Sequence, residues 1–392
     1  MDRRTFVATL GAAAAACAAP GVVAGQEPPP RGGVAPGRVG RLARGVNLSH
    51  WMWYPHAQGE QARRAFIPPA ELAALAAAGL THVRLPFEPS WLWDDATGAL
   101  RAAECAEYQD AARRCLDAGL AVVVDAHWSR TPWIRPRGAS HAGRFGELER
   151  MWRALAARLD ATDPDRVFLE LLNEPHDLAD ADHWHDAQRR IAAAVRGAAG
   201  RHTIIATGAE YGGIDGLLRL APLEDGSTVY SFHFYSPHNF THQGATWGFP
   251  PWKGMKDVPW PAERGDLERL ADTLPKDSRE ALRWSAREGT TDPWTPGALR
   301  AQIGRAAEWA RRHKAAVYCG EFGVHAAPAP RESRLRWHRE VGAALQEAGI
   351  GWAMWDDVGG FRLATGPPGA RELDAELGAA LGLEQRPVRK PP

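Results

Sequence analysis

The chain has 392 residues, of which 45% are hydrophobic and 24% charged, the composition of a soluble globular protein. Its formal net charge is zero, which gives no support to nucleic acid or an anionic membrane surface as a partner. The 17 tryptophans against 6 tyrosines form an unusual ratio, and flat indole rings are what a cleft that stacks on sugar rings would use.

Residues 1–24 are predicted to be an export signal. Arg3 and Arg4 precede an Ala-rich apolar stretch over residues 7–19, and small residues allow cleavage after Ala24. The stretch is too short and too weakly apolar for a membrane span. The Arg-Arg-x-Phe pattern resembles a twin-arginine signal, with an ordinary secretory signal as the alternative. We therefore expect an exported protein, either periplasmic or extracellular.

The rest of the chain is predicted to be one domain with loose ends. Residues 25–43 are rich in Pro, Gly and Arg and are expected to form a flexible lead-in. Residues 384–392 are expected to form a loose tail, which leaves residues 44–383 as the single folded domain.

The four cysteines predict no disulfide. Cys17 would leave with the signal, and Cys105 and Cys115 lie ten residues apart in a predicted helix, about 15 Å along its axis and too far to bridge. Cys319 lies within a strand pattern. A protein without disulfides can fold in a reducing cytoplasm before export, which fits the twin-arginine route.

Short apolar runs alternate with helical stretches through the predicted domain. Strands are expected at Gly45–Leu48, Thr81–Pro86, Ala121–Ala126, Val167–Leu172, Thr203–Thr207, Thr228–His233, Ala316–Cys319 and Gly351–Trp355. Helices are expected at Pro69–Ala78, Ala103–Ala118, Phe145–Asp160, Ala181–Ala199, Gly212–Leu220, Thr295–Lys314, Arg331–Glu347 and Arg371–Leu381. Eight strands alternating with helices predict an α/β fold of the (β/α)8 TIM-barrel type rather than an open sheet.

One long insertion, from Ser236 to Asp292, breaks this alternation after the sixth strand. It contains Trp247, Trp252, Trp260 and Trp284, and this aromatic content indicates an ordered segment. Because it leaves the end of a barrel strand, we expect it to fold over the rim as a wall of a cleft.

Two glutamates come at the ends of predicted buried strands. Glu174 follows the apolar run that starts at Phe168, and Glu321 follows the run that starts at Val317. The carboxyl ends of parallel barrel strands form the rim that carries active sites. Two carboxylates meeting there are what cleavage of a glycosidic bond needs, one to protonate the leaving oxygen and one to attack or stabilise the sugar.

Other polar and aromatic side chains occupy the same predicted rim in a characteristic order. They are Arg84, His127, Asn173, His233, Tyr235 and Trp355. Together with the two glutamates, this set resembles glycoside hydrolase family 5, the large cellulase family of the retaining (β/α)8 clan. The resemblance covers roughly Arg44 to Leu383, and the key positions show no departure from the family pattern.

The resemblance implies a role for each charged group. Glu174 would be the general acid/base and Glu321 the nucleophile of a retaining reaction, with the carboxyl groups about 5 Å apart. Such proximity raises the pKa of one carboxyl group, which keeps its proton for the leaving group. Arg84 would hold Glu321 ionised, and Tyr235 would donate its hydroxyl to Glu321.

The remaining rim residues would bind the sugar. By the same resemblance, Asn173 would bond the 2-hydroxyl, His127 and His233 would bond hydroxyls or orient the acid/base, and Trp355 would be the stacking floor beneath the reacting ring. Two further candidates for sugar contact lie outside that pattern, namely Trp128 and Trp247.

Structural explanations compete with each of these roles. The glutamates alone would be compatible with ion pairs at a barrel rim, Arg84 with bridging barrel carboxylates, the histidines with structural hydrogen bonds, and the tryptophans with core packing. Glu170 alternates with leucines and is interpreted as structural. Asp356 and Asp357 are adjacent and point in different directions, so no catalysis is assigned to them.

No metal or cofactor is expected. His176, His183 and His185 cluster with aspartates, but their spacing fits no common ligand pattern. The chain also lacks a glycine-rich phosphate loop. We expect a monomer whose partner is a β-glycan polysaccharide or oligosaccharide.

Two classes of function remain. The first is a secreted retaining endo-β-glycosidase, an enzyme acting by double displacement. Residues 234–237 and 240–245 look similar to segments of bacterial cellulase-like members of the family and favour β-1,4-glucan. Mannan, xyloglucan and β-1,3-glucan are alternatives, since fold does not fix substrate. The second class is a non-catalytic glycan-binding barrel, although a degenerate binder would normally have lost one of the two carboxylates.

Overall fold

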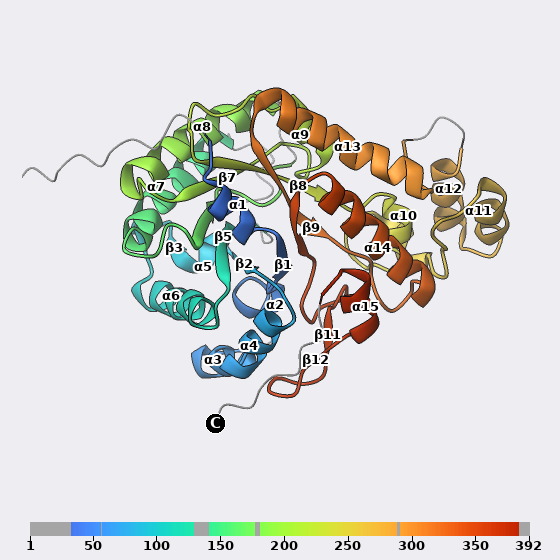
Figure 1. The fold of residues 1–392 in the computed structure, drawn as a ribbon, viewed down its shortest axis with the longest axis horizontal. Helices are drawn as coiled ribbons and strands as arrows, with labels where there is room; N and C mark the ends of the chain where they lie inside the picture. The colour runs from blue at the N-terminus through green and yellow to red at the C-terminus, as the bar shows by residue number, and fades with distance from the viewer. Residues whose placement is uncertain (1–32, 56, 129–140, 177–180, 288–290, 384–392) are drawn as a thin grey trace, which may run out of the picture.

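A computed structural model describes residues 33–55, 57–128, 141–176, 181–287 and 291–383. Eight parallel strands close into a barrel, in the spatial order β1-β10-β9-β8-β7-β6-β5-β2, with helices around the outside (Figure 1). The barrel strands are β1 (Arg44–Asn47), β2 (His82–Phe87), β5 (Ala121–Ala126), β6 (Val167–Glu170), β7 (Thr203–Thr207), β8 (Thr228–Phe234), β9 (Ala316–Phe322) and β10 (Gly351–Met354). The (β/α)8 prediction is therefore confirmed.

The helices return the chain from the end of one strand to the start of the next. The main ones are α4 (Pro69–Ala77), α6 (Ala102–Asp117), α7 (His141–Leu159), α8 (Ala181–Ala198), α9 (Ile214–Arg219), α13 (Pro296–His313) and α14 (Arg331–Glu347). Shorter elements are α1 (Pro36–Arg41), α2 (Ser49–Met52), α3 (Glu60–Phe66), α5 (Pro89–Leu92) and α15 (Ala375–Ala380), with the two-stranded pairs β3 (Trp93–Asp94) with β4 (Ala99–Leu100) and β11 (Ala364–Thr365) with β12 (Glu372–Leu373).

The strands carry apolar side chains on both faces, because one face lines the barrel interior and the other lies beneath the helices. Every residue of β5 is buried, as the run Ala-Val-Val-Val-Asp-Ala requires for a parallel strand. Inward side chains such as Val123, Phe168 and Tyr318 pack in the barrel interior with Leu42. The outward side chains join a larger core beneath the helices. Two packed layers thus fix the positions of the strand ends.

The insertion after β8 is helical in its described part. It contains α10 (His238–Thr241), the 3-10 helix η1 (Pro250–Gly254), α11 (Arg264–Ala271) and α12 (Lys276–Ser285). In Figure 1, α11 and α12 lie together at one edge of the molecule, beyond α10. Within the described residues of the insertion, the early part contacts the rim, where His242 packs against Tyr235 and Phe361. Residues near α10 therefore contact the rim, while α11 and α12 lie farther out, and the cleft wall remains a prediction.

Some predicted boundaries differ from the structure. The seventh strand was expected to end at Cys319, but β9 continues to Phe322. The helix expected over 371–381 is wrong at its start, since Glu372 and Leu373 pair with β11 before Asp374 caps α15.

Residues 33–43 are more ordered than a flexible lead-in would be. Within them, α1 forms and Leu42 packs into the barrel interior, while Arg38 pairs with Asp165. The predicted signal at residues 1–24 and the tail at 384–392 lie outside the described residues. In the described part of the chain, no helix combines the length and apolar character needed to cross a membrane. Cys105, Cys115 and Cys319 are buried free thiols.

Candidate active site

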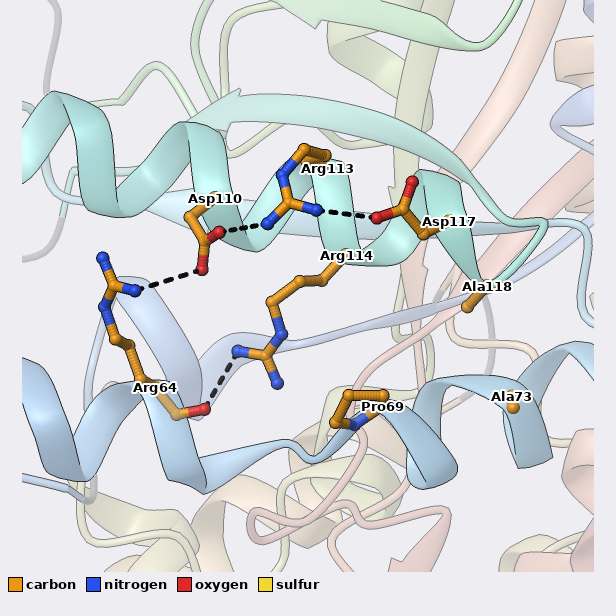
Figure 2. Close-up of a pocket in the computed structure, with 8 residues that line it drawn as sticks. All are labelled: Arg64, Pro69, Ala73, Asp110, Arg113, Arg114, Asp117 and Ala118. Atoms are coloured by element: carbon orange, nitrogen blue, oxygen red, sulfur yellow. Dashed lines mark hydrogen bonds and ion pairs between the residues drawn. The ribbon is translucent and has the colours of Figure 1, made fainter.

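One surface hollow lies away from the strand ends. It has a volume of about 700 Å³ and lies on the outside of the barrel, between α3, α4 and α6 (Figure 2). Its charged groups are paired with one another: Arg113 bonds Asp110 and Asp117, and Arg114 donates to the carbonyl oxygen of Arg64. The side chains that line this hollow are therefore not assigned to catalysis.

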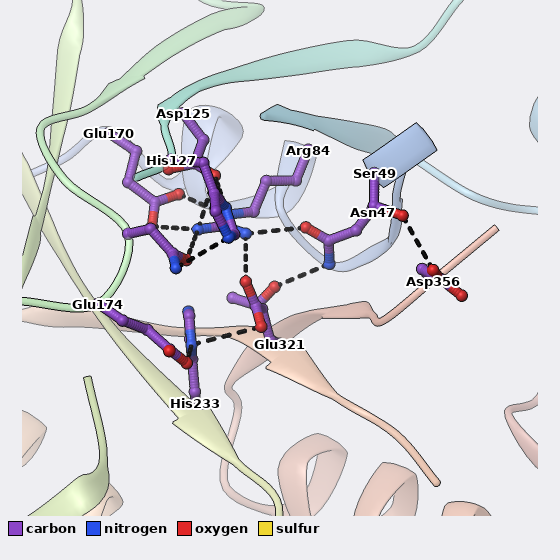
Figure 3. Close-up of polar contacts among 12 residues, drawn as sticks. Asn47, Ser49, Arg84, Asp125, His127, Glu170, Glu174, His233, Glu321 and Asp356 are labelled. Carbon is purple, nitrogen blue, oxygen red and sulfur yellow. Dashed lines mark hydrogen bonds and ion pairs between the residues drawn. The ribbon is translucent and has the colours of Figure 1, made fainter. Parts of the chain in front are cut away.

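The carboxyl ends of the strands instead gather a dense polar cluster (Figure 3). Arg84 lies on β2, His127 follows β5, Asn173 and Glu174 follow β6, His233 lies on β8, and Glu321 lies on β9. A register shift between β8 and β9, with Gly320 as the extra residue of β9, sets His233 directly opposite Glu321. The rim residues predicted from the sequence are therefore brought together.

Arg84 is the buried hub of this cluster. Its guanidinium donates two hydrogen bonds to Glu170, of 2.7 and 2.9 Å, and lies 2.9 Å from Asp125. It also donates to Asn47 at 2.9 Å and to Glu321 at 2.7 Å. One cation thus contacts three carboxyl groups, and these pairings raise the pKa of Arg84 further despite its burial.

Glu321 is held by two donors. The Nη1 atom of Arg84 bonds one carboxylate oxygen, and the hydroxyl of Tyr235 bonds the other at 2.8 Å. Burial raises the pKa of Glu321 to about 7, while His233, Arg84 and the Tyr235 hydrogen bond oppose that rise. Because both oxygens accept hydrogen bonds, this geometry favours the ionised form of Glu321.

Glu174 lies opposite Glu321 and has fewer hydrogen-bond donors around its carboxyl group. An oxygen of each carboxyl group and a ring nitrogen of His233 lie within 4.8 Å of one another. The Nδ1 atom of His233 is 2.7 Å from Glu174 and 3.5 Å from Glu321. Burial raises the pKa of Glu174 to about 7 as well. With both pKa values raised, the carboxyl group that lacks the arginine and tyrosine donors is the one that keeps a proton.

The orientation of Asn173 follows from its neighbours. Arg84 can only donate, so the amide oxygen of Asn173 faces it at 2.7 Å, and the amide nitrogen faces His127 at 3.0 Å. His127 then accepts through Nε2 and donates from Nδ1 to Asp125 at 2.8 Å. Burial lowers the pKa of His127 well below its usual value, which keeps the ring neutral. The second amide hydrogen of Asn173 remains for another acceptor.

Aromatic rings line the rim beside these groups. Trp355 lies 5.5 Å from the ring of His127, nearly parallel to it, and 5.6 Å from Trp53. Trp128 is half-buried and stacks on Phe145. Trp247 is 51% exposed and contacts His325 edge-on. Trp355 thus lies within the polar cluster, Trp128 at its margin, and Trp247 at the surface of the insertion.

Residues outside the predicted set complete the site. Asn47 bridges Arg84 to the carbonyl oxygens of Gly320 and Met354, and Asp125 orients His127. Asn47 is the last residue of β1 and Asp125 the last but one of β5, positions close to the strand-end signal that marked Glu174. Glu170, which was interpreted as structural from the sequence, accepts two hydrogen bonds from the guanidinium of Arg84. Asp356, next to Trp355, accepts from Ser49 at 2.9 Å and so anchors that loop.

The only group of three potential metal ligands among the described residues is Glu174, His233 and Glu321. Their atoms already bond one another, Tyr235 and Arg84, and the guanidinium beside Glu321 repels a cation. The cluster of His176, His183 and His185 does not form such a group in that part of the chain.

Comparisons with known proteins identify the family to which the chain belongs. A model of the cellulase family (glycosyl hydrolase family 5) matches residues 45–358. The chain therefore belongs to glycoside hydrolase family 5 and is a cellulase-like hydrolase of β-glycans.

Several relatives illustrate the family. Endoglucanase C of Acetivibrio thermocellus is 29% identical over 319 residues, which covers 80% of this chain and 90% of that protein. Cellodextrinase A of Ruminococcus flavefaciens is 25% identical over 320 residues, 79% of this chain and 83% of that protein. Among solved structures, the endoglucanase Cel5A of Thermotoga maritima shares the fold with a TM-score of 0.69 at 24% identity, covering 88% of this chain and 98% of that one.

Proposed function

We propose that the protein is an exported, retaining endo-β-glycosidase that hydrolyses β-1,4-glucan by double displacement. One observation carries this proposal: carboxyl oxygens of Glu174 and Glu321 lie within 4.8 Å of each other across a buried rim site. Retaining glycosidases hold their carboxyl groups roughly 5–5.5 Å apart, whereas inverting enzymes leave roughly 6.5–9.5 Å for a water.

The first step uses the two glutamates in different protonation states. Glu321 attacks the anomeric carbon as an anion, and the glycosidic oxygen leaves with the proton of Glu174. Arg84 and Tyr235 support this assignment because both donate to Glu321, at 2.7 and 2.8 Å. Burial raises the pKa of both glutamates to about 7, and because Arg84 and Tyr235 favour the ionised form of Glu321, Glu174 is the group that keeps a proton and acts as the acid.

The second step reverses the proton transfer. Glu174, now ionised, removes a proton from a water molecule, and the resulting hydroxide attacks the anomeric carbon and releases Glu321. The product then has the configuration of the substrate, because two inversions have occurred. His233 contacts both carboxyl groups and so orients Glu174 through both steps.

The sugar in this account lies on Trp355 with its hydroxyls toward the polar cluster. The remaining amide hydrogen of Asn173 is assigned to the 2-hydroxyl, a contact that strengthens in the transition state. His127 stands between Asn173 and the ring of Trp355, so its role is to fix the amide and border the sugar.

The relatives favour β-1,4-glucan as the substrate, since they are named endoglucanase and cellodextrinase. Xyloglucan is the second candidate, because a xyloglucan-specific endo-β-1,4-glucanase of Bacteroides ovatus is 33% identical over a 99-residue stretch. Mannan and β-1,3-glucan are further alternatives on the same mechanism. Export rests on the paired arginines and apolar stretch within residues 1–24.

Two measurements test the proposal. Release of reducing sugar from a panel of soluble β-1,4-glucan, xyloglucan, mannan and β-1,3-glucan is expected to be fastest on β-1,4-glucan. Proton NMR of the first product from a cello-oligosaccharide is expected to show the β-anomer before mutarotation. Early appearance of the α-anomer would overturn the mechanism, and a faster rate on another glycan would overturn the substrate.

A further inference from the structure

Four buried side chains at the strand ends form a closed cycle of polar contacts. The Nη2 atom of Arg84 donates to the amide oxygen of Asn173 at 2.7 Å and lies 2.9 Å from Oδ2 of Asp125. The amide nitrogen of Asn173 is 3.0 Å from Nε2 of His127. The Nδ1 atom of His127 is 2.8 Å from the same Oδ2 of Asp125 (Figure 3). Asp125 is therefore joined to the amide of Asn173 by two routes, one through Arg84 and one through His127.

The direction of each hydrogen bond in this cycle is fixed by its two charged members. The guanidinium of Arg84 can only donate, and an ionised carboxylate can only accept. Burial holds the pKa of His127 well below its usual value, so the neutral imidazole carries one N–H, and Asp125 draws that hydrogen to Nδ1. Nε2 is then left as an acceptor, and it takes one amide hydrogen of Asn173.

Asp125 keeps this direction in either protonation state. Its Oδ2 atom already faces two nitrogen donors, from Arg84 and His127, so a proton on the carboxyl group goes to Oδ1. Oδ1 is buried and has no hydrogen-bond partner among the described residues. The side chain of Asp125 is fully buried, so it affects a bound sugar only through its neighbours in the cycle.

The cycle determines where the second amide hydrogen of Asn173 points. An amide group is planar, so fixing its oxygen on Arg84 and one hydrogen on His127 also fixes the direction of the other hydrogen. If the acceptor at Asp125 were removed, the imidazole of His127 would be free to carry its hydrogen on Nε2. Two donors would then face each other, and the amide of Asn173 would have to turn away.

We propose that Asp125 is a positioning residue that makes the site selective for a sugar with a free 2-hydroxyl group, because it fixes the direction of hydrogen bonding through His127 to Asn173. This inference rests on the proposed function, in which the second amide hydrogen of Asn173 contacts the 2-hydroxyl. The cycle needs an acceptor oxygen at Asp125, and it does not need the negative charge.

The test compares two substrates that differ only at C2 of the reacting sugar. They are 2,4-dinitrophenyl β-cellobioside and its analogue that lacks this 2-hydroxyl. The measured quantity is the ratio of kcat/KM on the first substrate to kcat/KM on the second, which does not depend on how much of a variant is folded.

Two substitutions of Asp125 separate the acceptor from the charge. Asp125→Leu has a similar size but no acceptor, and its ratio is expected to fall about tenfold, the loss of one hydrogen bond that strengthens in the transition state. Asp125→Asn is uncharged but can still present an oxygen to His127 and Arg84, and its ratio is expected to stay within about twofold of the wild-type value.

His127→Phe breaks the same connection at its second member and carries the test if Asp125→Leu does not fold. Its ratio is expected to fall as in Asp125→Leu, and the double variant is expected to fall no further, since the connection is already broken. Glu170→Gln is the matched control. Glu170 bonds Arg84 but lies outside the cycle, so this variant is expected to lower kcat/KM on both substrates and to leave the ratio unchanged.

The other outcomes contradict definite statements. An unchanged ratio in Asp125→Leu or in His127→Phe would overturn the proposal, because the amide of Asn173 would not depend on them. An equal fall in Asp125→Asn would also overturn it, since the charge and not the acceptor would then matter. A wild-type ratio no larger than that of Asn173→Ala would remove the contact on which the inference rests. A wild-type enzyme that hydrolyses neither substrate would instead overturn the proposed function.

Discussion

Replacing Arg84 with methionine tests whether the buried charge network is organised as the structure indicates. The change removes one cation and leaves Asp125, Glu170 and Glu321 facing one another without it. Removing one partner of a buried ion pair costs about 3–5 kcal/mol, because the remaining charge is uncompensated. We therefore expect Arg84→Met to lose at least that much free energy of unfolding and nearly all activity.

The pH dependence gives this prediction a specific signature. Arg84 lowers the pKa of all three carboxyl groups, yet Asp125 and Glu321 still have pKa values raised to about 7 by burial. Without Arg84 their folded-state pKa values rise further above the unfolded values. The folded variant then binds more protons than the unfolded chain up to a higher pH, so its deficit in stability is larger at pH 8 than at pH 5.

Equilibrium unfolding in denaturant, followed by tryptophan fluorescence at the two pH values, measures this deficit. Arg113→Met is the matched control, since Arg113 pairs with Asp110 and Asp117 on the exposed face of α6 and such pairs contribute about 0–1 kcal/mol. Adding Glu170→Gln is expected to destabilise the wild type but to stabilise Arg84→Met. The reasoning is refuted if Arg84→Met is no less stable than Arg113→Met, or if its deficit does not depend on pH.

Three further predictions concern activity. Glu321→Ala is expected to abolish turnover on every substrate. Glu174→Ala is expected to lose activity mainly on substrates with poor leaving groups, and azide is expected to restore part of its activity. If the activity of the Glu321 variant depended on the leaving group instead, the two roles would be reversed. The kcat/KM on β-1,4-glucan is expected to fall as the pH rises through about 7, where Glu174 loses its proton, and a constant rate up to pH 9 would argue against Glu174 as the acid. Trp247→Ala is expected to weaken polysaccharide hydrolysis by well over tenfold, roughly the loss of a stacking contact, and to affect a short activated aryl glycoside much less; equal losses on both would assign Trp247 to the fold.

The sequence predicts the barrel well because its signals are local. A run such as Ala121–Ala126 is buried along its whole length, and its apolar pattern alone identifies it as a strand. The end of β9 was less clear because Gly320 interrupts the pattern. In the structure a side chain at residue 320 would meet the hydroxyl of Ser231 at 2.7 Å, so glycine is required there for close packing within the barrel.

The site is predictable to the extent that strand ends can be recognised. Glu174 and Glu321 come as an apolar run stops, and Arg84 lies within the apolar strand β2, so the parallel topology brings these positions together. The contact of Tyr211 with His176 was not predictable, since it depends on a left-handed turn next to a second loop. Contacts of this kind join residues distant in sequence and leave no periodic pattern.

The order of the insertion also depends on contacts that a sequence pattern does not contain. Its aromatic content indicated an ordered segment, and Trp260 is indeed buried. Trp247 and Trp284 have the same residue type but are exposed, one near the rim and one on α12. Tertiary contacts distinguish them, since Trp260 donates to the carbonyl oxygen of Pro293 whereas Trp247 lies against His325.

Trapping of the glycosyl-enzyme tests the central claim most directly. The probe, 2-deoxy-2-fluoro-β-cellobiosyl fluoride, carries a good leaving group, and its 2-fluorine slows hydrolysis of the covalent intermediate. Intact-protein mass spectrometry is expected to show one added fluorocellobiosyl group, and peptide mapping is expected to place it on Glu321, with no label on Glu321→Gln. An adduct on any other residue, or turnover of cellotetraose without any adduct, would contradict the assignment of Glu321 as the nucleophile.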